Sequence, residues 1–258
     1  MSYILISNDD GIHGEGLTPL VEAVSQVSDV KVVVPLENCS GASNKLTLDR
    51  PLSPKTLKNG YIAVPGTPTD CVYLSCQGMF DEEPAFVVSG INEGANLGDD
   101  VLYSGTVAAA LEGRFLSKSA IAISLVGKTH YQTAAYVARY LLEHWGEFSL
   151  PQPCVLNVNV PDLPLEEIAG FKVTRLGRRR RAGKIEPHLN PRGSYGYWIA
   201  HAGEGVADEG TDFHAVQNNF VSLTPISIDM THEAYLSKMD VLNTNLNHGL
   251  AELNKPSS

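Results

Sequence analysis

The sequence predicts an α/β protein with a three-layer, Rossmann-like core around a mostly parallel sheet, plus a projecting β-hairpin and an extended C-terminal arm or helix. Runs rich in Val and Ile alternate with segments of helical spacing, which predicts parallel strands that helices cover on both faces. The chain has 258 residues, 43% of them hydrophobic, and is long enough to bury one large core. We expect a single domain over 1–258, with a core over about 1–165 and a ribbon and C-terminal oligomerisation extension over about 166–258.

The elements of the core follow one another at regular intervals, and each has its own signal. Short apolar runs predict the strands, and apolar residues at helical spacing predict the first helix. A stretch filled with alanine, the residue that favours helices most, predicts the second helix. The expected strands are 3–7, 29–35, 84–89, 120–125 and 154–160, and the expected helices are 17–27 and 106–115.

Two other segments lack this alternation. Residues 45–65 alternate leucines with polar residues and contain Asn59-Gly60, a strong turn signal, so we expect a β-hairpin that projects from the core. Residues 170–228 are rich in Gly, Arg and polar side chains, which predicts extended ribbons and loops that end in a strand at 220–223.

The carboxyl-terminal segment, from Ala234 onward, has the spacing of an amphipathic helix or a pair of helical turns. Its apolar side can pack on its own domain or dock on a partner subunit, because a terminal element is well placed to exchange. The apolar positions recur every three or four residues, at Leu236, Met239, Leu242, Leu246, Leu250 and Leu253.

Composition limits the class of function. The formal net charge of −10 argues against a nucleic-acid scaffold, because binding to a phosphate backbone needs a basic face. No apolar stretch approaches the roughly 20 residues that span a bilayer, and no signal sequence is recognisable. The cysteines, Cys39, Cys71, Cys76 and Cys154, form no CxxC pair, which is typical of a reducing cytosol. We therefore expect a cytoplasmic protein.

Two adjacent carboxylates, Asp9 and Asp10, end the first expected strand. Neighbouring acids repel each other and stay ionised at low cost only beside a cation or hydrogen-bond donors. The second and third strands lead to polar turns that contain Ser40 and Asn92. Each turn by itself is typical of a helix cap, but parallel strands bring all three to one sheet edge. Oxygen donors without a sulfur or imidazole set favour Mg²⁺, Mn²⁺ or Ca²⁺.

A second group of polar residues precedes the alanine-rich helix. Ser104, Gly105 and Thr106 put two hydroxyl groups and backbone amides at the positive end of a helix dipole, which favours an anion. An ordinary Ser/Thr cap explains the same residues. A metal and an anion-binding helix terminus at one edge together predict a phosphoester site.

Other signals are weaker or absent. His13 fits proton transfer or, more commonly, a capping role in its loop. The run Arg178–Arg181 fits a solvated face, recruitment of anionic substrates, or pairing with acids across an oligomer interface. The chain lacks GxGxxG after the first strand, GxxxxGK[ST] and GxSxG, which argues against dinucleotide binding, a P-loop NTPase and an α/β-hydrolase.

Five ordered motifs follow one another in the first half of the chain: Ser7–Gly11, Ser40–Asn44, Gly66–Val72, Ser89–Gly98 and Tyr103–Val107. They closely resemble the SurE (stationary-phase survival protein) family. The resemblance continues through Thr174–Arg179, Asp208–Asp212 and Val221–Pro225. Glu93 departs from it, because many members carry Ala or another small residue there.

The resemblance implies a divalent-metal-dependent 5′-nucleotidase that hydrolyses nucleoside 5′-monophosphates and also 3′-monophosphates, with exopolyphosphatase as a possible side activity. It implies one divalent cation per subunit, Mg²⁺, Mn²⁺ or Ca²⁺, and a homodimer or homotetramer with an exchanged C-terminal arm. The implied metal ligands are Asp9, Asp10, Ser40 and Asn92. The implied phosphate contacts are Asn96, Ser104, Gly105 and Thr106.

The mechanistic hypothesis is direct attack of water on phosphorus at the cation, with Asp9 or Asp10 orienting or deprotonating that water. Two other classes also place acids after a first strand. A haloacid-dehalogenase-type phosphatase needs a DxD pattern, whereas this chain reads Asn8-Asp9-Asp10-Gly11. A phospho-receiver domain needs an Asp at the end of its third strand, where this chain offers Ser89 and Asn92.

Overall fold

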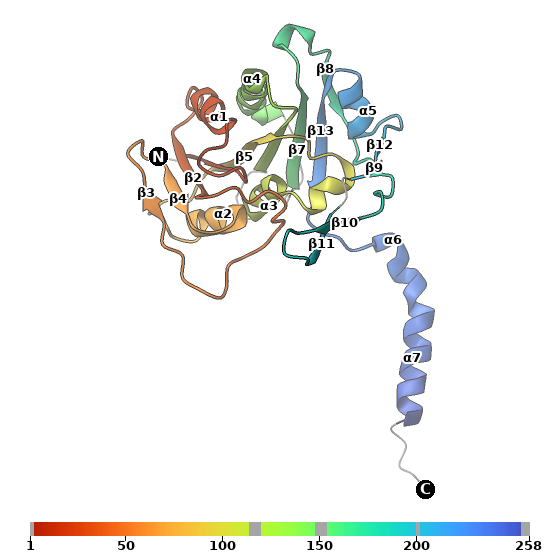
Figure 1. Ribbon diagram of the computed structural model, residues 1–258. Coiled ribbons are helices and arrows are strands. Elements are labelled where there is room, and N and C mark those ends of the chain that lie inside the picture. Colours follow the sequence, from red (N-terminus) through yellow and green to blue (C-terminus); the bar gives the residue numbers. More distant parts are fainter. Residues whose placement is uncertain (1–2, 114–119, 148–153, 200–201, 254–258) are drawn as a thin grey trace. The chain divides into compact units, whose positions relative to one another are not determined.

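The computed structural model describes residues 3–113, 120–147, 154–199 and 202–253 (Figure 1). The chain divides into two compact units, residues 1–226 and residues 227–258. All the expected strands lie in the first unit. The expected helix 106–115 extends past the described residues at its end.

Within the described residues, nine strands form the main sheet, in the order β3-β4-β2-β1-β5-β6-β7-β13-β8. From β4 to β7 all neighbouring strands are parallel, as the alternation predicts. The strands are β1 (Ile4–Ser7), β2 (Val30–Pro35), β3 (Lys55–Thr56), β4 (Ile62–Val64), β5 (Phe86–Glu93), β6 (Ala120–Val126), β7 (Cys154–Pro161), β8 (Gly170–Val173) and β13 (Phe220–Ser227).

Helices cover both faces of this sheet, which confirms the three-layer core (Figure 1). Helices α1 (Leu17–Val24) and α4 (Tyr131–Glu143) pack on the face that buries Ile4 and Ile6. Helices α2 (Pro68–Cys76) and α3 (Gly105–Glu112) pack on the face that buries Leu5. Each such fully buried side chain contributes about 1.5–3 kcal/mol, so the alternation along β1 fixes which face each helix covers.

The hairpin over 45–65 differs from the expectation. The turn at Asn59-Gly60 is present and Gly60 has a φ of +85°, but only β3 and β4 pair across it. Residues 45–54 form no strand, and β4 pairs in parallel with β2. The pair therefore extends the edge of the main sheet and does not project from the core, because the backbone N–H and C=O groups of β2 form hydrogen bonds with those of β4.

The segment after β7 contains the expected ribbons. β10 (Glu186–Leu189) pairs with β11 (Tyr195–Trp198), and β9 (Arg178–Arg179) pairs with β12 (Gly205–Val206). β8 and β13 join the main sheet, so this segment contributes to the core layer as well. Short helices complete the unit: η1 (Gly98–Leu102), η3 (Trp145–Glu147), η4 (Leu165–Glu167) and α5 (Asp212–Gln217).

The second unit is helical, as its spacing predicts. It contains α6 (Glu233–Leu236), η5 (Ser237–Met239) and α7 (Asp240–Leu253). No helix of the described segments is long and apolar enough to cross a membrane. Four of the predicted apolar positions are exposed, namely Leu236, Met239, Leu242 and Leu246. The side chains of Leu250 and Leu253 lie outside the described part.

Candidate active site

The carboxyl ends of β2, β1 and β5 meet at one edge of the sheet. β1 lies between the other two strands. The chain runs outward from β1 to β2 and β4 and then returns to β5 on the other side of β1, the arrangement that opens a crevice in doubly wound folds. The loop after β2 lies against the loop after β1, because the Cys39 N–H donates to the Asp9 carbonyl at 2.7 Å. Gly11 has a φ of +77°, and a Cβ there would lie 2.7 Å from the Glu37 carbonyl oxygen.

Asp9 is almost fully buried, with 3% of its surface exposed. Its Oδ1 accepts a hydrogen bond from the Thr106 hydroxyl, which comes from the start of α3. Burial raises the pKa of Asp9, while hydrogen bonds from Thr106 and from the backbone of Gly105 act against that rise. A Cβ on Gly105 would lie 2.7 Å from the Asp9 Cβ, so only glycine lets the helix start approach this closely.

Asp10 is more open than Asp9 and bonds to two neighbouring loops. Its Oδ2 accepts from the Glu93 N–H at 3.1 Å, and its Oδ1 accepts from Asn38 Nδ2 at 3.4 Å. Burial raises the pKa of Asp10 to about 6, and the charges of Asp9 and Glu93 add to the rise. The two carboxylates therefore resist ionisation together, and a nearby cation would relieve both.

Ser40 lies in the loop after β2, and Asn92 lies near the carboxyl end of β5, so the two residues flank this pair. The Ser40 hydroxyl donates to Asn38 Oδ1 at 2.7 Å, and Asn38 in turn bonds to Asp10, so Ser40 is linked to the acid pair through one side chain. Asn92 is 8% exposed, and its Nδ2 donates to the Gly94 carbonyl at 2.9 Å. The structure thus brings both residues to the same edge, without a direct hydrogen bond from either to the acids in the described part of the chain.

Asn96 is held by side chains of two strands. Its N–H donates to Asn159 Oδ1 at 2.8 Å, and its Nδ2 donates to Ser124 Oγ at 2.8 Å. Its carbonyl accepts from the side-chain amides of Asn157, at 2.8 Å, and Asn159, at 3.1 Å. Ser104 is the N-cap of α3 and accepts from the Val107 N–H at 3.1 Å, which is the ordinary capping role.

A cavity of about 780 Å³ opens beside Asp10. It contains four carboxylates and one imidazole, so it is strongly acidic, and His13 lies in its wall. Among the described residues no group of three or more His, Cys, Asp or Glu is placed to hold a metal ion, so a cation here needs oxygens from Ser or Asn as well. The cavity is lined by Asp10, His13, Gly14, Glu15, Leu36, Glu37, Asn38 and Glu93.

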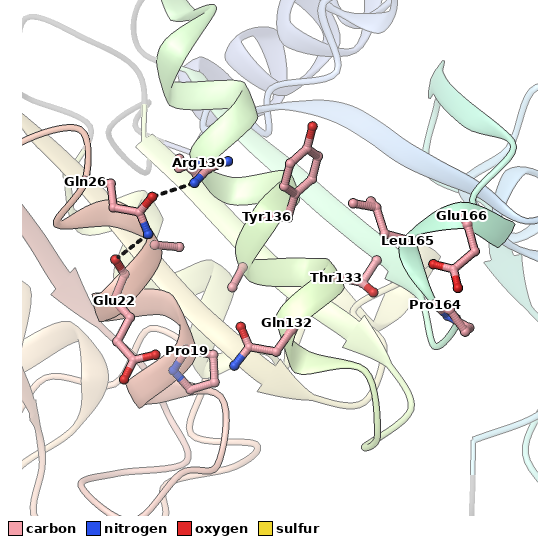
Figure 2. A pocket seen from close by; sticks show the side chains of 12 residues that line it. Pro19, Glu22, Gln26, Gln132, Thr133, Tyr136, Arg139, Pro164, Leu165 and Glu166 are labelled. Atoms are coloured by element: carbon pink, nitrogen blue, oxygen red, sulfur yellow. Dashed lines mark hydrogen bonds between the residues drawn. The ribbon is translucent and has the colours of Figure 1, made fainter.

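A second cavity, of about 460 Å³, lies between α1, α4 and residues 164–166 (Figure 2). Figure 2 shows Arg139 reaching across from α4 to Gln26, and their side chains are joined by a hydrogen bond of 2.5 Å. None of its lining residues comes from the loops that hold Asp9, Asp10, Ser40 or Asn92. This cavity is separate from the candidate active site.

The amino-acid sequence does not predict several residues of the site. The Asn38 side chain and the Glu93 backbone N–H donate directly to Asp10, but neither residue type indicates in the sequence which segment it will contact. Asn157 and Asn159 do have a signal, because they are polar residues on one side of the otherwise apolar strand β7. Both are fully buried, which marks them as partners of another polar group.

Among the described residues, the Arg178–Arg181 run forms an ion pair through Arg179. The Arg179 guanidinium bonds to both carboxylate oxygens of Asp100, at 2.7 and 2.6 Å. Arg178 is exposed. The run therefore divides into one partly buried structural arginine and solvated neighbours.

Comparisons with known proteins agree with this architecture. The family described as Survival protein SurE matches residues 4–183. A protein named 5'-nucleotidase SurE from Ectopseudomonas mendocina (strain ymp) is 55% identical, over 92% of this chain and 96% of its own. Another of that name, from Marinobacter nauticus (strain ATCC 700491 / DSM 11845 / VT8), is 56% identical, over 90% of this chain and 92% of its own.

Solved structures also match. The crystal structure of the Sure protein from Aquifex aeolicus superimposes with a TM-score of 0.83 and 39% sequence identity. The match covers 93% of this chain and 99% of that chain. Fold, strand-end residues and sequence similarity lead to the same assignment. This chain is a member of the SurE family.

Proposed function

We propose that this chain is a divalent-metal-dependent 5′-nucleotidase that hydrolyses nucleoside 5′-monophosphates to nucleoside and phosphate. The observation that carries the proposal is the bond from Thr106 to Asp9, because it brings the acid pair and the start of α3 together. The names of the relatives support the substrate class.

The donor set fits a hard divalent cation. Asp9, Asp10, Ser40 and Asn92 offer carboxylate, hydroxyl and amide oxygens and no sulfur or imidazole. The raised pKa values of the two acids support a cation at this place, because its charge would offset both burial and mutual repulsion. When bound, a divalent cation polarises a phosphoryl oxygen and acidifies water. We propose one cation per subunit, Mg²⁺, Mn²⁺ or Ca²⁺.

The start of α3 and Asn96 would receive the phosphate. Gly105 and Thr106 lie at the positive end of the helix, whose dipole would stabilise negative charge on the phosphoryl oxygens, and their backbone N–H groups also donate to Asp9. Asn96 Nδ2 donates one hydrogen to Ser124 and retains a second for the substrate. The Thr106 hydroxyl donates to Asp9, so we assign it the orientation of that carboxylate. Ser104 caps the helix and keeps its first turn in place.

Asp10 is the better placed of the two acids to orient the attacking water and accept its proton. It lines the open cavity, whereas Asp9 is buried and directed toward Thr106. In this scheme the two acids have different tasks: Asp9 would hold the cation, and Asp10, which lines the open cavity, would orient the water.

Metal removal and add-back test the proposal directly. The chelated protein should release no phosphate from AMP, GMP, CMP or UMP, and one of Mg²⁺, Mn²⁺ or Ca²⁺ should restore release. Asp9→Asn should abolish activity, whereas Asp29→Asn, which removes the same charge before β2 at the opposite edge, should not. Full turnover by the chelated protein or by Asp9→Asn would contradict the proposal.

Further parts of the proposal need their own assays. We propose that 3′-monophosphates and short polyphosphate are additional substrates, and the same phosphate-release assay measures both. We propose a homodimer or homotetramer in which the C-terminal arm, including α7, is exchanged, and a cytoplasmic location. Light scattering of the full chain and of a chain ending at residue 226 tests the oligomer. The division into one domain with this extension stays a prediction.

A further inference from the structure

The segment between β5 and α3 lies between two groups of contacts. It contains η1, and it leads from Asn96 to Ser104, two residues of the proposed phosphate site. One group of contacts comes from β9 and α5, and the other comes from the loop that contains Ser40. The position of η1 therefore bears on both halves of the proposed site.

On the first side, Arg179 holds η1 through two acids. Its Nε and Nη2 donate to the two carboxylate oxygens of Asp100, and its backbone N–H donates to Asp99 Oδ2 at 2.7 Å. Asp100 and Arg179 each expose 24% of their side chains, and Arg179 Nη1 also donates to the Gly203 carbonyl. A bidentate pair of this kind fixes direction as well as distance.

The start of η1 is held equally closely. The Gly98 N–H donates to Asp212 Oδ2 at 2.7 Å, and the Gly177 N–H donates to Asp212 Oδ1 at 2.8 Å. A Cβ on Gly98 would lie 2.6 Å from the Phe213 ring. Because the start of η1 packs directly against Asp212 and Phe213, it cannot move further toward α5, and the Arg179–Asp100 pair adds a second contact on the same side.

On the second side, η1 holds the loop that contains Ser40. Ser43 Oγ donates to the Leu102 carbonyl at 2.7 Å, and the Ser43 N–H donates to the Tyr103 carbonyl at 3.2 Å. The next residue, Ser104, caps α3. A shift of η1 would therefore move the loop of Ser40 and the first turn of α3 at the same time.

We propose that Arg179 is a positioning residue for both the loop that contains Ser40 and the first turn of α3, and that it acts through Asp100 and η1. The inference rests on the proposed function. Loss of the guanidinium removes the contacts that hold Asp100 and η1 on one side. The Leu102 and Tyr103 carbonyls that accept from Ser43 then shift, and so does Ser104, the cap of α3. A displacement of about 1 Å at a reacting centre can lower a rate 100-fold, so a small shift is measurable.

The test compares Arg179→Gln, Arg179→Lys and the neighbouring control Arg178→Gln. Arg178 is exposed on the same short strand. Mn²⁺ binding to the chelated protein is measured by calorimetry, and KM and kcat for AMP are measured at saturating Mn²⁺. Arg179→Gln should weaken Mn²⁺ binding at least threefold and raise KM at least fivefold, with a smaller fall in kcat. The Mn²⁺ affinity and KM of Arg179→Lys should lie between those of Arg179→Gln and the unchanged protein, and Arg178→Gln should match the unchanged protein in both.

Thermal unfolding separates this role from a merely structural one. Arg179→Gln with a lowered Tm but unchanged Mn²⁺ affinity and KM would overturn the inference. If Arg179→Gln does not fold, Asp100→Asn removes the same ion pair with a side chain of the same shape and should reproduce the two shifts. If the unchanged protein binds Mn²⁺ but hydrolyses no nucleotide, the proposed function fails, and the Mn²⁺ comparison still decides the role of Arg179.

Discussion

The hydrogen bond from Thr106 to Asp9 gives the sharpest prediction. Thr106 is fully buried and Asp9 is 3% exposed, so water cannot replace the hydroxyl when it is removed. Thr106→Val keeps the shape of the side chain and deletes only the hydrogen bond to the carboxylate. Thr106→Ser is the matched control, because it keeps the hydroxyl and deletes only a methyl group.

The expected magnitudes differ enough to be separated. A hydrogen bond to a charged group contributes about 1.5–3 kcal/mol to the free energy of unfolding, so Thr106→Val should lose that amount. One buried methyl group contributes about 0.8 kcal/mol, so Thr106→Ser should lose less. If the bond persists in the transition state, the same loss makes Thr106→Val about 10- to 100-fold slower. Thr106→Ser should stay within about threefold of the unchanged protein.

The assays are urea unfolding of the metal-free protein from pH 5 to 8 and phosphate release from AMP with Mn²⁺. The folded-state pKa of Asp9 is raised, so its contribution to stability is lost as the pH rises through that pKa. Without the Thr106 hydroxyl the pKa rises further, so the stability difference between Thr106→Val and the unchanged protein should grow with pH. A Thr106→Val protein as stable and active as the unchanged protein, or a Thr106→Ser protein worse than Thr106→Val, would refute the reasoning.

Three further predictions follow from the same structure. In Gly105→Ala the new Cβ meets the Asp9 Cβ at 2.7 Å, so we expect a loss of about 1–3 kcal/mol in urea unfolding and weaker Mn²⁺ binding by calorimetry. The pKa of Asp10 is raised to about 6, so a cation must displace a proton, and Mn²⁺ affinity should rise between pH 5 and 7; a flat profile would contradict this. Although burial by itself raises the pKa of Asp162, hydrogen bonds from the backbone and ring of His130 are among those that lower it to about 2. The depressed value stabilises the protein above the unfolded pKa of about 3.9, so stability should fall from about pH 4 to pH 2, and Asp162→Asn should remove that part of the fall in an acid titration.

The strands were predictable because their signal is local. β1, β2, β5, β6 and β7 each contain a short run rich in Val, Ile or Leu, and the structure places each strand within a few residues of its expected bounds. The helix α2 was not predicted, although the capping box of Thr67 and Asp70 with Pro68 between them marks its start. The helix α4 was missed as well.

The hairpin shows why local signals are insufficient. The turn at Asn59-Gly60 depends on nearby residues and is present as predicted. Whether β4 would project or join the sheet depends on the unpaired edge of β2, which lies 27 or more residues earlier in the chain. Residues 45–54 instead contact α2, where Asp70 accepts from the N–H and hydroxyl of Thr47 at 2.9 and 2.7 Å.

The fold class and the position of the acid pair follow from local patterns in the chain. Val- and Ile-rich runs alternating with helices leave a covered parallel sheet as the stable arrangement, and Asp9-Asp10 must then lie at its carboxyl edge. The contacts that surround that pair arise only when the whole chain has folded. The Thr106 hydroxyl on Asp9, the Asn38 and Glu93 contacts to Asp10, and the hold of Arg179 on η1 join residues far apart in the chain. Hydrogen bonds of this kind have no periodicity along the sequence, because they depend on which segments the closed sheet brings within hydrogen-bond distance of each other.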